Sequence, residues 1–193
     1  MIWNFYDFDD TLVLTRPAIY KSYRYAFRKV INLELPWGEF NSKLYTNANS
    51  YMAQLGFTNQ RIREVKKAKN EEYLNHYWKD IEVLKTDFDM KEKHIVVSNT
   101  TSDVIAAILN KLDMAGPFSN IIGSDIYLGA NRKPAPDLYN YAFSQIEEMF
   151  NKEEDTIVIH EDSPFGLSAA MSFYEEHKDK IKKFKIIYIP QSF

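Results

Sequence analysis

The 193-residue chain contains no cysteine. This absence excludes a disulfide framework, a cysteine nucleophile and a metal site built from thiolates. The chain also lacks any run that approaches the ~20 apolar residues of a membrane-spanning helix, and no basic segment followed by an apolar run opens it. We therefore expect a cytoplasmic protein that does not bind a membrane.

A strong charge of either sign is lacking as well. The chain has 24 basic and 27 acidic residues, so its formal net charge is −3, and we expect no nucleic-acid partner. The basic run at residues 178–183 is short and interrupted, which is typical of a solvated helix end. The hydrophobic fraction of 45% is ordinary for a globular protein, and we expect a monomer with a small-molecule partner.

Short runs of aromatic and β-branched residues alternate with helical patterns along the chain. The runs that predict strands begin near residue 2 and continue at 94–97, 121–124, 156–160 and 184–189. Because strands that alternate with helices form parallel sheets, this order predicts an α/β fold with a doubly wound, Rossmann-like sheet. We expect a helix from Asp137 to about Phe150 and an irregular connection over residues 81–93.

Residues 15–80, between the first two predicted strands, have helical patterns throughout. Pro17 suits a first helical turn, and Thr58 can begin a long polar helix. We therefore predict two domains. The first is an α/β core of residues 1–14 and 81–193, and the second is a small all-helical domain of residues 15–80, inserted after the first strand.

Polar side chains follow three of the predicted strands where each strand ends. These residues are Asp7 and Asp9, then Ser98 and Asn99, then Glu161 and Asp162. Ligands of open parallel sheets bind outside the carboxyl ends of the strands, and Lys133 lies on a loop that can reach the same edge. The sequence therefore predicts a site at this edge of the sheet.

The residue types at this edge indicate phosphoryl-transfer chemistry. Several carboxylates, without cysteine or clustered histidine, favour Mg²⁺, which prefers oxygen ligands and a substrate phosphate. A serine hydroxyl, backbone N–H groups at a helix start and a lysine bind phosphate oxygens. An aspartate can act as nucleophile by forming an aspartyl-phosphate. We therefore expect a small phosphorylated metabolite as the substrate.

Four motifs give this chain a family resemblance. They are Asp7-Phe8-Asp9-Asp10-Thr11, then Ile95-Val96-Val97-Ser98 followed by Asn99, then the segment 132–137 (RKPAPD) and the segment 161–166 (EDSPFG). In this order, each after its predicted strand or on its loop, they resemble the haloacid dehalogenase superfamily in its β-phosphoglucomutase-like phosphatase branch. The resemblance covers nearly the whole core and implies that residues 15–80 form the helical cap of that family.

The resemblance implies catalytic and metal-binding roles for four acidic residues. Asp7 is expected to be the nucleophile and a ligand of Mg²⁺. Asp9 is expected to protonate the leaving alcohol and then activate water, while its backbone carbonyl also touches the metal. Asp162 is expected to be a metal ligand, and Glu161 a direct or water-mediated one.

The resemblance also implies phosphate-binding roles for four residues. Ser98 and Lys133 are expected to hold the phosphoryl oxygens, and the backbone N–H of Asn99 to assist them. Thr11 is expected to orient the loop that carries the opening aspartates. Closure of the cap, with hinges near residues 12–15 and 80–85, would exclude water and position the substrate.

The resemblance leaves several functions open. Hydrolysis of a phosphomonoester is the reading that the motifs favour, and a sugar-phosphate mutase uses the same core. A catalytically silent member that binds phosphate is a further alternative, although none of the expected residues is lost. Asp9 argues against a dehalogenase, and phosphonate hydrolysis would need a cap lysine such as Lys43.

Overall fold

The computed structural model describes residues 1–45, 47–126 and 131–190. The chain forms two compact units, which we call the core unit (Met1–Leu14 and Val83–Phe193) and the helical unit (Thr15–Glu82). None of the described helices is long and apolar enough to cross a membrane.

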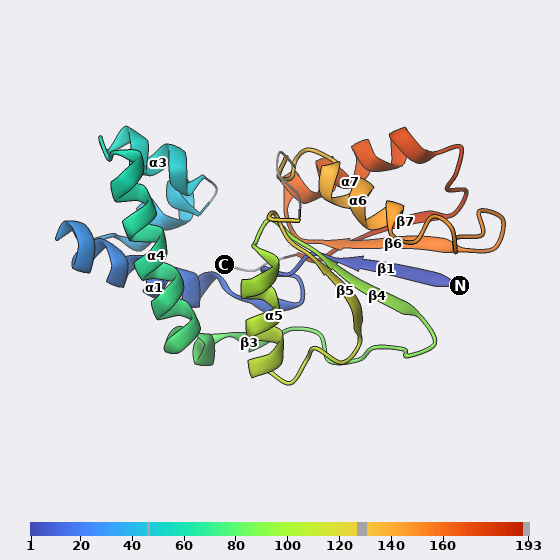
Figure 1. Ribbon diagram of the computed structural model, residues 1–193, viewed down its shortest axis with the longest axis horizontal. Coiled ribbons are helices and arrows are strands. Elements are labelled where there is room, and N and C mark those ends of the chain that lie inside the picture. The colour runs from blue at the N-terminus through green and yellow to red at the C-terminus, as the bar shows by residue number, and fades with distance from the viewer. Residues whose placement is uncertain (46, 127–130, 191–193) are drawn as a thin grey trace. The chain divides into compact units, whose positions relative to one another are not determined.

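Five described strands of the core unit form a parallel sheet in the order β5-β4-β1-β6-β7 (Figure 1). They are β1 (Ile2–Tyr6), β4 (Lys93–Val97), β5 (Phe118–Ile122), β6 (Thr156–Glu161) and β7 (Phe184–Tyr188). This sheet confirms the predicted α/β class. The first strand is central because its aromatic side chains can be buried between neighbours on both sides.

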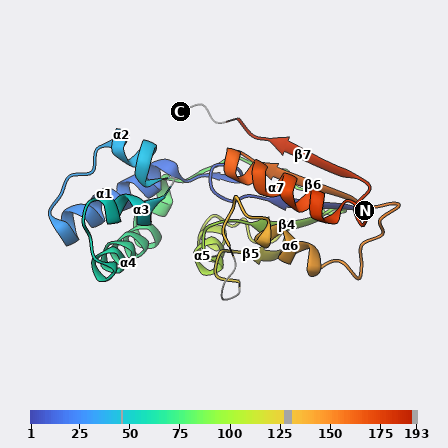
Figure 2. The same ribbon diagram turned by 90° about the horizontal axis from the view of Figure 1, so that it is seen from above.

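Helices cover both faces of this sheet. Figure 1 shows α6 (Asp137–Ser144) and α7 (Pro164–His177) on one side and α5 (Ser102–Lys111) on the other. Figure 2 shows α7 beside β6 and β7. Phe5 and Tyr139 stack with a centroid distance of 6.4 Å in the core between β1 and these two helices. This packing fixes the carboxyl ends of β1, β4 and β6 beside one another.

The return from the helical unit to the core is irregular, as the sequence predicts. After β3 (Glu82–Val83) the chain reaches β4 without a helix in the fully described residues 84–92. Here the ring of Phe88 packs against Tyr6, His94 and Phe118, with centroid distances of 5.2–5.9 Å. The strands β2 (Val13–Leu14) and β3 form a separate two-stranded sheet, which the sequence analysis did not anticipate.

The helical unit is built around its own apolar cluster. Its helical segments are α1 (Arg16–Ile31), α2 (Trp37–Glu39), the π-helical turn Phe40–Leu44, α3 (Ala48–Gln54), α4 (Asn59–Asn75) and the 3₁₀ turn Tyr77–Asp80. The fully buried side chains of Phe40, Met52 and Val65 contribute to the cluster. Thr58 accepts a capping hydrogen bond of 3.3 Å from the backbone N–H of Arg61, so α4 begins where its sequence predicts.

Two predicted element boundaries are wrong. The helix expected to reach Phe150 ends at Ser144, because the backbone N–H groups of Ile146 and Met149 bond to carbonyls three residues earlier and tighten the chain into turns. This tightening buries Ile146 in the core. The third strand begins at Phe118 instead of residue 121, since its polar residues pair with β4 across an irregular register at His94 and Ile95.

Candidate active site

Asp7 follows β1 directly and opens a tight loop. Its backbone N–H donates to the carbonyl of His160 over 3.0 Å, which continues the pairing of β1 with β6. The N–H of Asp10 then donates to the carbonyl of Val13 over 2.7 Å, and Asp10 has a φ of 61°. Aspartate tolerates this left-handed conformation better than most side chains. The loop thus turns sharply and leaves Asp7 at the edge of the sheet.

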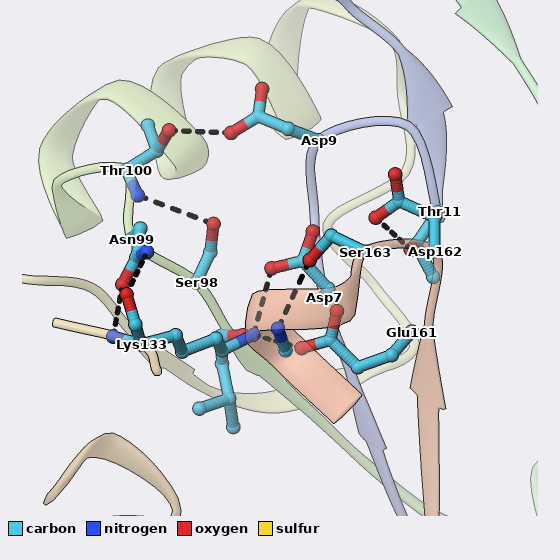
Figure 3. A network of polar contacts seen from close by, with 12 residues as sticks. Asp7, Asp9, Thr11, Ser98, Asn99, Thr100, Lys133, Glu161, Asp162 and Ser163 are labelled. Carbon is cyan, nitrogen blue, oxygen red and sulfur yellow. Dashed lines mark hydrogen bonds and ion pairs between the residues drawn. The ribbon is translucent and has the colours of Figure 1, made fainter. Parts of the chain in front are cut away.

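Lys133, from the segment before α6, extends into the centre of the site. Its ammonium donates to Asp7 Oδ1 over 2.8 Å and to the carbonyl of Val97 over 2.7 Å, and it also donates to Glu161 Oε1 (Figure 3). The same nitrogen lies 4.9 Å from the ring centroid of Tyr139. The side chain of Lys133 is only 3% exposed, so these contacts replace its hydration.

Asn99 fixes the backbone of Lys133 at the same time. The N–H of Lys133 donates to Asn99 Oδ1 over 2.8 Å, and Asn99 Nδ2 donates to the carbonyl of Lys133 over 3.1 Å. The family resemblance implied a role only for the backbone N–H of Asn99. The structure places its side chain as a two-point connection between the loop after β4 and the lysine.

Three carboxylates converge beside the lysine. Asp7, Glu161 and Asp162 each offer an oxygen, and these three atoms lie within 4.8 Å of one another. Glu161 is fully buried, and its Oε1 accepts from the hydroxyl of Tyr139 over 2.5 Å as well as from Lys133. Its Oε2 is buried with no hydrogen-bond partner in the described residues. A buried carboxylate oxygen without a partner is costly, and a cation in contact with it would reduce that cost.

A glycine makes room for this carboxylate. A Cβ placed on Gly166, in the first turn of α7, would lie 1.9 Å from Glu161 Oε2 and 2.0 Å from its Cδ. No side-chain carbon fits there without moving the carboxylate. The glycine of the fourth sequence motif therefore has a direct steric reason.

Burial is the largest influence on the pKa values of Asp7 and Asp162. Burial raises the pKa of Asp7 well above its usual range, against the opposing effect of Lys133. Burial, with the charges of Asp10 and Glu161, raises the pKa of Asp162 to about 7. Burial acts to lower the pKa of Lys133, but Asp7 and Glu161 outweigh it and the net shift is upward. The lysine thus stays protonated beside an excess of negative charge.

The remaining predicted site residues lie around this group. Ser98 is buried at the end of β4, and its Oγ accepts from the N–H of Thr100 over 3.2 Å. The hydroxyl of Thr11 donates to Asp162 Oδ1 over 3.3 Å, so Thr11 contacts one of the three carboxylates. Asp9 Oδ2 accepts from the hydroxyl of Thr100 over 2.5 Å, and no side-chain oxygen of Asp9 belongs to the three-carboxylate group.

Two residues of the site were missed in the sequence. Tyr139 lies two positions after the RKPAPD segment, and Thr100 lies two positions after Ser98. Each follows a recognised motif at short range, which was the available signal. Their partners, Glu161 and Asp9, are 22 and 91 residues away in the chain. The sequence therefore shows that both residues lie near a motif, but it does not show which residues they contact.

Comparison with protein families gives one match. A model of the family described as haloacid dehalogenase-like hydrolase matches residues 5–174. That range contains every residue of the site described above. Among curated proteins, none matches this sequence.

Solved structures share the fold at low sequence identity. CbbY from Rhodobacter sphaeroides, in complex with phosphate, is 19% identical with a TM-score of 0.75, over 98% of this chain and 86% of that one. A haloacid dehalogenase-like family hydrolase from Streptococcus pneumoniae is 14% identical with a TM-score of 0.68, over 95% and 92%. A candidate beta-phosphoglucomutase from Thermotoga maritima is 18% identical with a TM-score of 0.68, over 100% and 88%.

Proposed function

The chain belongs to the haloacid dehalogenase-like hydrolase family, and from this membership we propose that it is a Mg²⁺-dependent phosphatase. Its substrate in this proposal is a small phosphomonoester, hydrolysed through an aspartyl-phosphate on Asp7. The family is the one predicted from the four sequence motifs, and that prediction is confirmed. The observation that carries the proposal is the contact of Asp7 with Lys133 beside two further buried carboxylates.

The residues present fit a hard divalent cation. The donor set consists of carboxylate oxygens, one of which, Glu161 Oε2, is buried without a hydrogen-bond partner in the described residues. Burial, with a smaller effect of neighbouring carboxylates, raises the pKa values of Asp7 and Asp162, and a bound cation would favour their ionised forms. Asp7 and Asp162 would hold the ion, with Glu161 directly or through water and Asp9 through its carbonyl. When bound, Mg²⁺ supplies positive charge near the phosphoryl oxygens.

The first half-reaction transfers the phosphoryl group to Asp7. A carboxylate oxygen of Asp7 attacks phosphorus while the bond to the leaving oxygen breaks, and Asp9 gives its proton to the leaving alcohol. Lys133, held by Asp7 and Glu161, fixes the rotation of the nucleophile and supplies positive charge to the phosphoryl oxygens. The hydroxyl of Ser98 binds the same oxygens.

The second half-reaction releases phosphate. Asp9, now a carboxylate, takes a proton from a water molecule that attacks phosphorus, and the bond to Asp7 breaks. The site then holds inorganic phosphate and both aspartates in their starting states. CbbY, which shares this fold, has been crystallised with phosphate and in a mutant form with xylulose-(1,5)bisphosphate. These complexes support a phosphorylated metabolite as the substrate class.

We propose that the helical unit acts as the cap of this site. The chain passes between the units at Leu14/Thr15 and again at Glu82/Val83. These crossings lie within the segments 12–15 and 80–85, where we expect the hinges. The proposed closure would exclude water from the first half-reaction and contribute to substrate choice.

The proposal is tested by phosphate release from an aryl phosphate with Mg²⁺ and with excess chelator. We expect turnover that needs the metal and is lost in Asp7→Asn. Asp179→Asn, at an exposed position near the end of the chain, is the matched control and should keep full activity. Retention of a tenth or more of the activity by Asp7→Asn would show that the nucleophile is assigned wrongly.

A sugar-phosphate mutase is the second candidate, because the structural neighbours include the candidate beta-phosphoglucomutase. The same protein sample separates the two. A mutase would isomerise a sugar phosphate when a sugar bisphosphate is added and would release little free phosphate, whereas a phosphatase would release phosphate without that addition.

A further inference from the structure

We propose that Thr100 is a positioning residue for Asp9, and that its hydroxyl determines which carboxylate oxygen of Asp9 exchanges the proton. This inference rests on the proposed function, since it concerns the residue that protonates the leaving alcohol. It adds to the site a residue that the sequence motifs did not include.

The contact joins two loops that are far apart in the chain. Thr100 Oγ1 donates to Asp9 Oδ2 over 2.5 Å, across 91 residues of sequence. In Figure 3 the carboxylate of Asp9 is directed at Thr100, while Asp7 is directed at Lys133. The two opening aspartates thus have different partners, which matches their different proposed roles.

Thr100 is itself held firmly by the core unit. Its N–H donates to Ser98 Oγ over 3.2 Å, and its carbonyl accepts from the N–H of Ser124 over 3.1 Å. A Cβ on Gly123 would lie 2.7 Å from that carbonyl oxygen, so the absence of a side chain at position 123 permits the close approach. The hydroxyl of Thr100 therefore points at Asp9 from a backbone with little freedom to move.

This arrangement assigns different tasks to the two oxygens of Asp9. The hydroxyl of Thr100 donates its single proton to Oδ2, so Oδ2 acts as an acceptor. A protonated Asp9 then carries its proton on Oδ1, and this proton passes to the leaving oxygen as the bond to phosphorus breaks. In the second half-reaction Oδ1 takes a proton from water. Correct orientation of such a group matters because proton transfer requires hydrogen-bond reach.

The leaving group supplies a readout that a merely structural role would not move. A weakly basic leaving group, such as 4-nitrophenolate, departs with little help from an acid, whereas the more basic phenolate needs the proton. The value of kcat/KM covers the chemistry up to departure of this group. Misplacing the Asp9 carboxyl should therefore slow phenyl phosphate much more than 4-nitrophenyl phosphate, two substrates of similar size.

The experiment compares Thr100→Val, which removes the hydroxyl at nearly constant volume, with Thr100→Ser, which keeps it. We expect Thr100→Val to raise the ratio of kcat/KM for 4-nitrophenyl over phenyl phosphate by about tenfold, the upper end of the range for one intramolecular hydrogen bond. Thr100→Ser should stay within about threefold of the wild type. In an Asp9→Asn background, Thr100→Val should add almost nothing, because the group that it positions is gone.

The outcomes separate this inference from the proposed function. Equal losses on both substrates in Thr100→Val, or an unchanged ratio, would overturn the inference while leaving a working phosphatase. A full additional effect of Thr100→Val in the Asp9→Asn background would overturn it as well. If the wild type releases no phosphate from any tested monoester, the proposed function fails first and the inference falls with it. Thermal unfolding of each variant identifies any loss of the fold, and Thr100→Ala, which also lacks the hydroxyl, then takes the place of Thr100→Val.

Discussion

The two units each contain a small charge cluster, and the two clusters differ in burial and in the sign of their net charge. In the core unit, two carboxylates of Asp7 and Glu161 share the single ammonium of Lys133, whose side chain is 3% exposed. In the helical unit, one carboxylate of Glu34 is shared by two guanidinium groups, and these side chains are 43–57% exposed. The first cluster is buried and has an excess of negative charge, and the second is solvated and has an excess of positive charge.

This difference indicates what each cluster does. Exposed ion pairs contribute little to stability, because water and salt screen them. Buried charges are costly to desolvate and are strongly perturbed, and such groups gather at functional sites. The raised pKa values of Asp7 and Asp162 are perturbations of the kind expected for buried charges. We therefore expect catalysis at the core cluster and a modest structural role for the helical one.

The largest expected effect comes from the nucleophile. Asp7→Asn should lower kcat by about 10³-fold or more, because the covalent intermediate cannot form. The free energy of unfolding should not fall, since one of the mutually repelling carboxylates is removed. Steady-state kinetics and urea unfolding of the same sample measure the two quantities. A variant that lost stability along with activity would weaken the contrast between the two clusters.

Removal of the Lys133 ammonium, which Asp7 and Glu161 share, should destabilise the core unit. Lys133→Met leaves Asp7 and Glu161 buried without their common partner, and we expect a loss of about 3–5 kcal/mol in the free energy of unfolding. Arg28→Met in the helical unit removes one exposed partner of Glu34 and should leave the free energy of unfolding almost unchanged. Similar losses in the two variants, measured by urea unfolding, would contradict the assigned difference.

A matched tyrosine pair sharpens the comparison further. Tyr139 donates to Glu161 and Tyr51 donates to Glu39, each over 2.5 Å, the first in the core unit and the second in the helical unit. Tyr139→Phe keeps the ring beside Lys133 but removes the donor, and should cost about 1–3 kcal/mol of stability and weaken Mg²⁺ binding. Tyr51→Phe should leave Mg²⁺ binding unchanged. Isothermal titration with Mg²⁺ would contradict this if both variants bound it like the wild type.

A further expected effect is a pH dependence of opposite sign for Asp162 in the core unit and Glu34 in the helical unit. The folded-state pKa of Asp162, about 7, lies above its ordinary value of 3.8. The stability that Asp162 contributes is therefore fully present at pH values below 3.8 and is lost as pH rises toward about 7. Hydrogen bonds from Arg28 and Arg24 lower the pKa of Glu34. The contribution of Glu34 to the free energy of unfolding is therefore present above the ordinary pKa of the carboxyl group and is lost as pH falls.

This pH dependence can be measured as a difference in the free energy of unfolding between each variant and the wild type. Without metal, Asp162→Asn should become more stable relative to the wild type between pH 4 and pH 7, because the variant has no carboxylate to ionise. Saturating Mg²⁺ should reduce this difference by favouring the ionised form of Asp162 in the wild type. Glu34→Gln should lose stability relative to the wild type as pH rises from acid, and Mg²⁺ should not alter that. Urea unfolding at several pH values measures both trends.

The parts of the core that the sequence predicted are those fixed by local pattern. Strand runs ending in Asp7, Ser98 and Glu161 predicted a common edge, because the carboxyl ends of parallel strands meet there. The family resemblance then implied the roles that we expect for these residues. Both steps depend on residues that lie close together in the chain and on one general rule of sheet topology.

The parts that the sequence did not predict depend on contacts between distant segments. The hydroxyl of Thr100 on Asp9 and that of Tyr139 on Glu161 are determined by three-dimensional packing, and short-range patterns do not encode such pairs. α6 ends at Ser144, where the chain tightens into turns that bury Ile146, whereas helical periodicity alone predicted a helix to about Phe150. Asp10 adopts a left-handed backbone conformation that few residues other than glycine favour. An aspartate at this position was therefore only weak evidence for the turn.

The most direct test of the central claim is to locate the phosphoryl group on the protein. Asp9→Asn, which should slow release of phosphate from the intermediate, is mixed with 4-nitrophenyl phosphate and Mg²⁺, quenched in acid and reduced with borohydride. Reduction converts an aspartyl-phosphate to homoserine, which peptide mass spectrometry can locate. The account predicts this conversion at position 7 and its absence when Asp7→Asn is added. Conversion at another residue, or turnover with no conversion at position 7, would contradict it.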